Sequence, residues 1–159
     1  MKKQLVIIGI VAVLVSVGFS GCTQTKNDTN SEDDILKQTV NEEQLKDEFE
    51  SVANNIAKSI DTVTEVKNYN ESLFIQHKQE LYNHDDICEL DYSYKDARDY
   101  IIAGLENLVN KEYDNSYSSF LRADNSVIGA NSYTGDMWPI QFGFENGVCY
   151  VLWNMGYKP

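Results

Sequence analysis

The chain opens with a short, almost uninterrupted apolar run. The run from Leu5 to Phe19 contains only two glycines and one serine, and Lys2 and Lys3 precede it. A bilayer-spanning helix needs roughly 20 apolar residues, and this run is shorter. A basic start, a short apolar stretch and small residues before a cleavage point are typical of a secretory signal peptide. We therefore expect residues 1–21 to be a signal peptide.

Helical periodicity begins at Asn41. Apolar residues then recur at spacings of three and four, as on one face of an amphipathic helix, at Leu45, Phe49, Val52, Ile56, Ile60, Val63 and Val66. Asn41 and Gln44 fit a helix start signal, and the pattern predicts one helix up to about residue 68. Further helices are expected over about 70–82, 93–110 and 112–123 or slightly beyond. Because short connections favour antiparallel neighbours, these elements predict a small bundle of about four helices.

The carboxyl-terminal segment, residues 138–153, has a different period. Asn146-Gly147 is a strong signal for a two-residue hairpin turn. A turn there pairs Phe142 with Val151 and Ile140 with Trp153 on one apolar face. The predicted fold class is thus mainly α, a small helical bundle with a C-terminal β-hairpin. The domain is expected to span residues 41–159.

One helix pair within the bundle has the spacing of a known repeat. Residues 97–130 resemble a single tetratricopeptide-type helix pair, on the strength of Tyr100, Gly104, Asn107, Ser116, Phe120 and Ala123. Asn107 and Ser116 are polar departures from that pattern, Ile128 stands where proline is usual, and no second copy occurs 34 residues upstream. Solenoids need about three repeats, so the pair is interpreted as a helical hairpin. The family's peptide-binding role is implied only through the resemblance.

The apolar run ends at a cysteine in a characteristic context. Phe19-Ser20-Gly21-Cys22 resembles the lipobox of prokaryotic lipoproteins, with Phe19 in place of the usual leucine. The resemblance implies removal of residues 1–21, a lipid on Cys22, and a protein held on the extracytoplasmic face of the cell membrane. Two or more acyl chains would anchor it firmly. Residues 22–40 then form the lipidated cysteine and a flexible polar tether. The alternative is an uncleaved signal-anchor helix in which Cys22 has no role.

The charge balance excludes one class of partner. The 159-residue chain has a formal net charge of −12, and removal of Lys2 and Lys3 with the leader leaves 11 basic and 25 acidic residues. Nucleic-acid binding requires Lys and Arg to displace counterions from phosphates, so no nucleic-acid partner is expected. The same charge disfavours electrostatic docking on anionic lipid.

Two cysteines remain once Cys22 is assigned to a lipid. Disulfides persist outside the membrane, and Cys88 and Cys149 are therefore the candidate disulfide. The opposing interpretation is that Cys149, on the apolar face of its segment, is an ordinary buried thiol. The sequence leaves both open.

No motif nominates a metal site or a catalytic centre. Residues 83–91 gather His84, Cys88 and four carboxylates, but their spacing matches no zinc pattern and no calcium loop. We interpret the stretch as an acidic, solvated connection, and expect no metal, no cofactor and no catalytic residues. An enzyme, such as an envelope hydrolase, is the least favoured class, because nothing nominates a nucleophile.

Two function classes therefore compete. The favoured one is a non-catalytic protein-interaction or structural role on the outer face of the membrane, with an envelope protein as partner. The alternative is a small-molecule or glycan-binding lipoprotein, with aromatic residues available to line a cleft, namely Tyr92, Tyr94, Trp138, Tyr150 and Trp153. An interaction protein should expose a contiguous apolar patch, whereas a ligand-binding protein should have a concave pocket.

Overall fold

A computed structural model describes residues 32–131, 139–142 and 147–157. The predicted signal peptide, residues 1–21, and Cys22 lie outside these ranges. The described residues form helices α2 (Glu32–Ser59), α3 (Val63–Asn68), α4 (Glu71–Tyr82), α5 (Asp86–Leu90), α6 (Tyr92–Val109), α7 (Tyr113–Asn131) and α8 (Val148–Asn154). None of these helices is both long enough and apolar enough to cross a bilayer.

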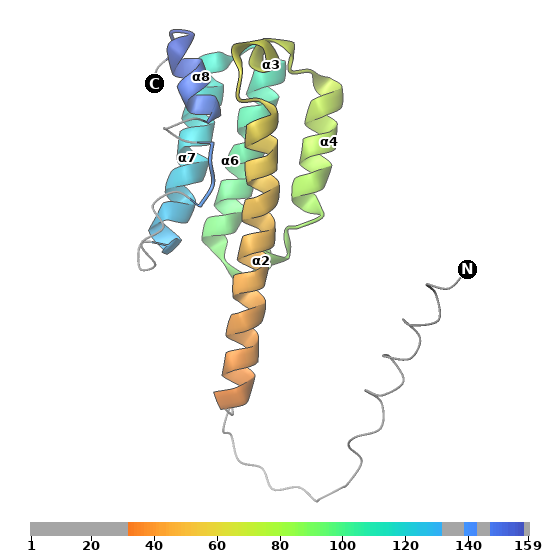
Figure 1. Ribbon diagram of the computed structural model, residues 1–159, viewed down its shortest axis with the longest axis vertical. Coiled ribbons are helices and arrows are strands. Elements are labelled where there is room, and N and C mark those ends of the chain that lie inside the picture. Colours follow the sequence, from red (N-terminus) through yellow and green to blue (C-terminus); the bar gives the residue numbers. More distant parts are fainter. Residues whose placement is uncertain (1–31, 132–138, 143–146, 158–159) are drawn as a thin grey trace, which may run out of the picture. The chain divides into compact units, whose positions relative to one another are not determined.

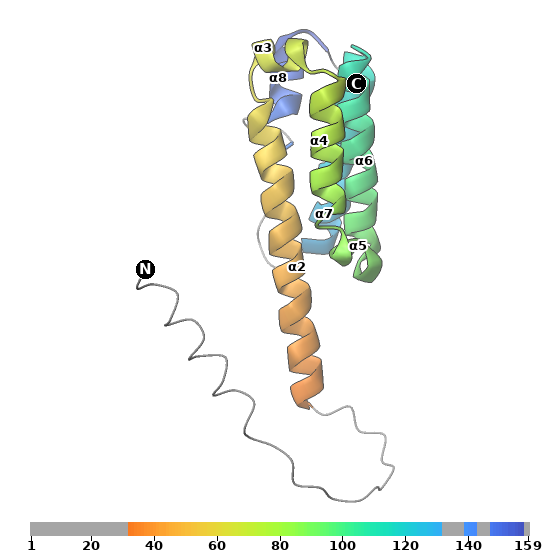
Figure 2. The ribbon, with the colours of Figure 1, turned by 90° about the vertical axis from the view of Figure 1, so that its right-hand side faces the viewer.

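The four longer helices, α2, α4, α6 and α7, run alongside one another, as Figures 1 and 2 show. The short helices α3 and α8 lie at one end of this bundle, and α5 lies at the other end of α6. The prediction of a mainly helical bundle is confirmed. Its core combines aliphatic and aromatic side chains from all four long helices, among them Phe49, Ile56, Leu81, Tyr94, Ile101, Leu105 and Phe120, each at most 1% exposed.

The first helix differs from its prediction at both ends. It begins at Glu32, so residues 32–40, expected in the tether, are helical. It ends at Ser59, and the single helix predicted up to about residue 68 is divided into α2 and α3. Thr62 is the reason: its side chain accepts a hydrogen bond from the backbone N–H of Glu65, and the Glu65 carboxylate accepts one from the backbone N–H of Thr62. This capping box starts a new helix within a continuous apolar pattern.

Side-chain caps also fix the starts of α4 and α6. Asn70 accepts hydrogen bonds from the backbone N–H groups of Ser72 and Leu73, so the helix expected from about residue 70 begins at Glu71. Asp91 caps α6 by accepting from the N–H of Ser93 at 2.9 Å, so this helix begins one residue before the predicted start. The extended backbone of Asp91 separates α5 from α6, because a capping residue leaves the helical conformation to present its side chain.

Close packing of α6 on α7 depends on a glycine. A Cβ atom at Gly104 would lie 2.6 Å from the Phe120 ring, well inside van der Waals contact. Ser116 donates a hydrogen bond to the backbone carbonyl of Gly104 at 2.8 Å, and Ala123 is fully buried. The positions on which the tetratricopeptide resemblance rested therefore include the facing residues of this helix pair.

The predicted C-terminal β-hairpin is wrong. Residues 148–154, expected as its second strand, form helix α8, with Gly147 in extended backbone at its N-cap. Val148, Cys149, Val151 and Leu152 are buried, and Tyr150 and Trp153 are exposed. Buried positions at i, i+1, i+3 and i+4 follow the helical period rather than the strand period of two. The alternation of apolar and polar residues on either side of Asn146-Gly147 therefore predicted a strand where the chain forms a helix.

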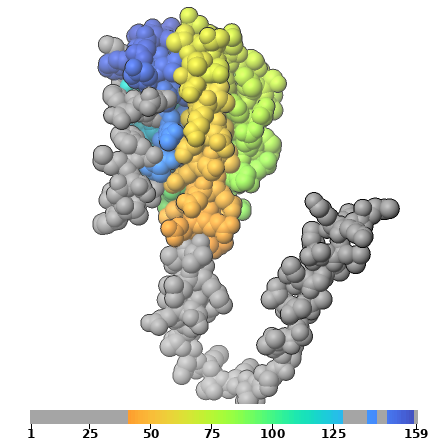
Figure 3. All heavy atoms as spheres, viewed as in Figure 1, coloured from red at the N-terminus to blue at the C-terminus, as the bar shows by residue number. Residues whose placement is uncertain are grey.

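The carboxyl-terminal segment completes the core from the side of α2 and α7. The Asn54 side chain of α2 donates to the carbonyl of Pro139 at 2.9 Å and accepts from the N–H of Gln141 at 2.7 Å. Phe142 stacks on Phe120 with ring centroids 4.8 Å apart. Figure 3 shows α2 crossing this face of the molecule between the carboxyl-terminal segment and α4.

Candidate functional site

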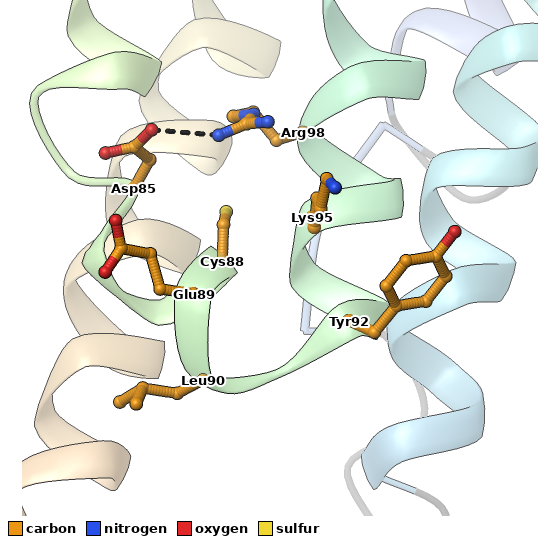
Figure 4. A pocket seen from close by; sticks show the side chains of 7 residues that line it. All are labelled: Asp85, Cys88, Glu89, Leu90, Tyr92, Lys95 and Arg98. Carbon is orange, nitrogen blue, oxygen red and sulfur yellow. Dashed lines mark hydrogen bonds and ion pairs between the residues drawn. The ribbon is translucent and has the colours of Figure 1, made fainter.

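A surface pocket of about 470 Å³ lies where α5 meets α6, and Figure 4 shows it. Its lining consists of Asp85, Cys88, Glu89, Leu90, Tyr92, Lys95 and Arg98. The cap of α6 at Asp91 turns the chain between the two helices, so that each helix supplies one wall. Lys46 of α2 makes an ion pair with Asp91 at 3.6 Å and holds this corner against the bundle.

Charges in the pocket are segregated by element. Asp85 and Glu89, four residues apart, come from the start and body of α5, while Lys95 and Arg98, three apart, come from α6. Such spacings place both members of each pair on one helix face. Figure 4 shows the carboxylates on one side, Lys95 on the other, and the Cys88 thiol between them.

One pair of these charges is mutually neutralised. Arg98 donates to the Asp85 carboxylate at 2.8 Å and to Asp99 at 2.9 Å, and its guanidinium lies 5.0 Å from the centre of the Tyr82 ring. Burial lowers the pKa of Arg98, but the hydrogen bond and charge of Asp99 outweigh it and leave that pKa raised. Arg98 is therefore a fixed cation that holds Asp85 in place.

The Cys88 thiol in the pocket is unreactive, and the side chains at the pocket rim are apolar. Burial raises the pKa of the Cys88 thiol to about 11, which outweighs the opposite effect of Arg98. The thiol is thus protonated near neutral pH and is a poor nucleophile. Leu90 and Tyr92 are 57% and 71% exposed at the rim, so the pocket combines charged walls with apolar edges.

The two candidate disulfide cysteines are buried in different surroundings and are both free. Cys88 lies in the pocket, whereas the Cys149 thiol donates a long hydrogen bond of 3.7 Å to the Tyr117 carbonyl of α7. The predicted bridge is therefore not formed, and the alternative of a buried free thiol at Cys149 holds. Cys149 lies on the buried face of helix α8, and its side chain is therefore part of the core.

A serine–histidine pair that the sequence did not reveal lies between α2 and α4. The Tyr69 hydroxyl is 2.9 Å from His77 Nδ1, the Ser59 hydroxyl is 3.4 Å from Nε2, and Ser59 donates to the Ile56 carbonyl at 2.7 Å. Burial raises the pKa of Tyr69 and lowers that of His77. Because Ser59 directs its one proton to the Ile56 carbonyl, its oxygen accepts from Nε2. Nδ1 is then the unprotonated nitrogen and accepts from the Tyr69 phenol.

The direction of these hydrogen bonds argues against catalysis. With its proton on Nε2, His77 can only donate to Ser59, and it cannot remove the serine proton as a general base would. The Ser59 proton is already directed to Ile56. The group is a chain of hydrogen bonds that satisfies a buried histidine, and we interpret it as structural.

Asp124 of α7 is the other buried polar side chain that requires an explanation. It is 1% exposed, and neither carboxylate oxygen has a hydrogen-bond partner among the described residues. Burial raises its pKa to about 8, and the nearby backbone N–H of Phe142 opposes this only in part. Cys149 of α8 is the titratable neighbour, and its own pKa is raised by burial and then by the charge of Asp124. The carboxyl group is therefore neutral in the folded protein at pH 7.

The aromatic residues proposed for a cleft do not converge. Tyr92 lines the pocket, Tyr94 is fully buried in the core, and Tyr150 and Trp153 lie on α8 at the other end of the bundle. Trp138 lies outside the described residues. No group of three or more His, Cys, Asp or Glu within the described ranges is placed to hold a metal ion. The acidic stretch 83–91, expected as a connection, instead contains α5 and forms one wall of the pocket.

Comparison with known proteins gives no further guide, because no protein family, no curated protein and no solved structure matches the chain.

Proposed function

We propose that the protein is a lipid-anchored, non-catalytic binding protein on the extracytoplasmic face of a prokaryotic cell membrane. The anchor rests on the signal-peptide pattern and on the lipobox-like sequence that ends at Cys22. The binding role rests on the pocket between α5 and α6. It is a concave site with charged walls, and the chemistry around it lacks an activated nucleophile, because the Cys88 thiol is protonated.

The pocket favours a small ligand over a broad protein contact. Large exposed apolar side chains in the described part of the chain are divided among α3, α4, the α5–α6 corner and α8, where they are Val63, Ile75, Tyr82, Leu90, Tyr92, Tyr150 and Trp153. Single exposed apolar residues are normal on soluble surfaces, whereas a docking face is contiguous. The small-molecule alternative raised by the sequence therefore becomes the leading form of the proposal.

A protein partner is the second candidate, and one observation favours it. Leu90 and Tyr92 are both exposed at the rim of the pocket, and Tyr82 lies against Arg98 in its wall. Three of the exposed apolar side chains are thus gathered at one corner. A partner that covered this corner would bury them together with the pocket.

Helix α2 extends beyond the pocket corner towards its own amino terminus. Lys46 contacts Asp91 at the pocket corner, and α2 begins at Glu32. At 1.5 Å per residue, the intervening helix is about 21 Å long.

The anchor is tested by mass and by fractionation. We expect the native protein from membranes to lack residues 1–21 and to carry the added mass of acyl chains. Cys22→Ala should release the protein from the membrane fraction, while Cys88→Ala, the control, should remain there. A full-length, unmodified mass with Cys22→Ala still in the membrane would contradict the anchor and favour a signal-anchor helix.

The form of binding is tested by photo-cross-linking in cells. A benzoylphenylalanine probe at Tyr92 would report contacts at the pocket rim, and the same probe at Tyr150, 50% exposed on α8, is the matched control. A single dominant protein adduct at Tyr92 and none at Tyr150 would favour the protein partner. No protein adduct at either position, together with a thermal shift on addition of a small ligand, is the result expected for a small-molecule site.

A further inference from the structure

We propose that the pocket between α5 and α6 binds a small zwitterion of the amino-acid type, whose ammonium group pairs with Glu89 and whose carboxylate pairs with Lys95. The inference rests on the proposed binding function and names the class of ligand. It depends on the separation of opposite charges onto the two walls and on the apolar rim.

Two charged side chains of the pocket, Glu89 and Lys95, remain available to pair with a ligand. The ion pair at 2.8 Å between Arg98 and Asp85 closes one part of the pocket. Glu89 and Lys95, on opposite walls, make no ion pair within the described ranges. The Lys95 ammonium group lies over the Tyr92 ring, with Nζ 5.7 Å from the ring centre. The pocket therefore offers one carboxylate on the α5 wall and one ammonium group on the α6 wall.

The charge of the chain and of the two pocket walls favours a ligand with no net charge. The whole chain carries −12, so an anion would approach against a repulsive field. A cation would leave Lys95 on the α6 wall without a charged partner. A neutral sugar would leave both Glu89 and Lys95 without a charged partner. A zwitterion has no net charge and still supplies a charge-assisted hydrogen bond to each wall.

The volume of the pocket and its apolar rim favour a ligand with an apolar side chain. The pocket volume of about 470 Å³ exceeds what two charged groups alone would occupy. Leu90 and Tyr92 at the rim are largely exposed, and an apolar ligand side chain would cover them. Together, these features favour an amino acid with an apolar side chain, either free or as a dipeptide.

The test uses the native protein, purified from membranes in detergent, and isothermal titration with five named probes. L-leucine and L-leucyl-L-leucine are the zwitterions, and they distinguish a free amino acid from a dipeptide. The acid 4-methylpentanoate lacks the ammonium group, 3-methylbutylamine lacks the carboxylate, and glucose is neutral. We expect one of the zwitterions to bind and both single-charge analogues to bind about tenfold to a hundredfold more weakly, the loss typical of one charge-assisted hydrogen bond.

Two substitutions separate the walls. Glu89→Gln should weaken zwitterion binding about tenfold or more and leave the binding of 4-methylpentanoate unaffected. Lys95→Gln should also weaken zwitterion binding about tenfold or more, but it should leave the binding of 3-methylbutylamine unaffected. Glu106→Gln, on an exposed position near the other end of α6, and Lys58→Gln, near the end of α2, are the matched controls and should bind as the parent does.

The outcomes distinguish this inference from the binding function on which it rests. Equal binding of leucine and 4-methylpentanoate, or binding of glucose alone, would overturn the zwitterion and leave a small-molecule function intact. Failure of all five probes with a dominant protein adduct at Tyr92 would replace it with the protein partner. Failure of all five probes without any adduct would overturn the proposed function as well.

Discussion

Replacing the buried carboxyl group of Asp124 with an amide should change how stability depends on pH. Asp124 lies on α7 and is 1% exposed, and its carboxylate oxygens have no hydrogen-bond partner among the described residues. Its pKa is raised from 3.8 to about 8, chiefly by burial. In the unfolded chain the group ionises at its ordinary pKa, so between these values the folded state holds a proton that the unfolded state has lost.

The sign and the size of the effect follow from this difference. The stability associated with neutral Asp124 is fully present below about pH 4 and is lost as the pH rises towards 8. Each pH unit costs about 1.4 kcal/mol of the free energy of unfolding. The total is on the order of 5 kcal/mol, a large fraction of the 5–15 kcal/mol typical of a whole domain. Asp124→Asn removes the titrating proton and with it this loss.

The assay is urea unfolding followed by circular dichroism at pH 5, 6, 7 and 8. We expect the two proteins to differ by no more than about 1 kcal/mol at the acid end, and Asp124→Asn to gain over the parent at each step. Burial lowers the pKa of His77, which acts with the opposite sign below pH 6.5, but both proteins contain His77 and the comparison cancels it. Asp114→Asn, an exposed position on the same helix, measures any general effect of removing one negative charge.

A constant difference between Asp124→Asn and the parent across this pH range would refute the reasoning. It would mean that the carboxylate is ionised in the folded protein and is solvated or paired there.

Two further predictions concern packing and the thiols. Gly104→Ala would gain about 1 kcal/mol of helix propensity, but its Cβ would lie 2.6 Å from the Phe120 ring, and overpacking typically costs about 1–3 kcal/mol. We therefore expect a lower melting temperature, recovered in part when Phe120→Leu is added. A higher melting temperature in the single variant would contradict the close approach of the two helices. Cys88 and Cys149 are both buried and free, so the intact mass should not change on reduction and both thiols should react with a maleimide only after unfolding. A gain of two hydrogens on reduction would show a bridge instead.

Much of the fold is encoded locally. The caps at Asn70 and Asp91 act on backbone N–H groups two or three residues away, and amphipathic spacing identifies the helix faces that become the core. The start of α3 was also present in the sequence, as Thr62 and Glu65, but the longer apolar stripe concealed it. Local hydrogen bonds of this kind depend on neighbouring residues, which is why they can be recognised from the chain.

Other features needed the tertiary structure. The residues after Gly147 satisfy both a strand pairing and a helical face, and α8 buries Val148 and Leu152 against the bundle; periodicity over seven residues does not decide between them. The pocket likewise depends on how α5 and α6 meet, although the i, i+4 carboxylates at Asp85 and Glu89 were a usable signal.

The sequence by itself determined the helical class and the strongly acidic charge balance, because these depend on near neighbours and on totals. Only the tertiary structure decided that Cys88 and Cys149 are buried free thiols and that the Asp124 carboxyl group is buried with no hydrogen-bond partner among the described residues. It also decided that Glu89 and Lys95 line opposite walls of one pocket. Those facts depend on which side chains the packing of distant segments brings together, and on how far it removes them from water.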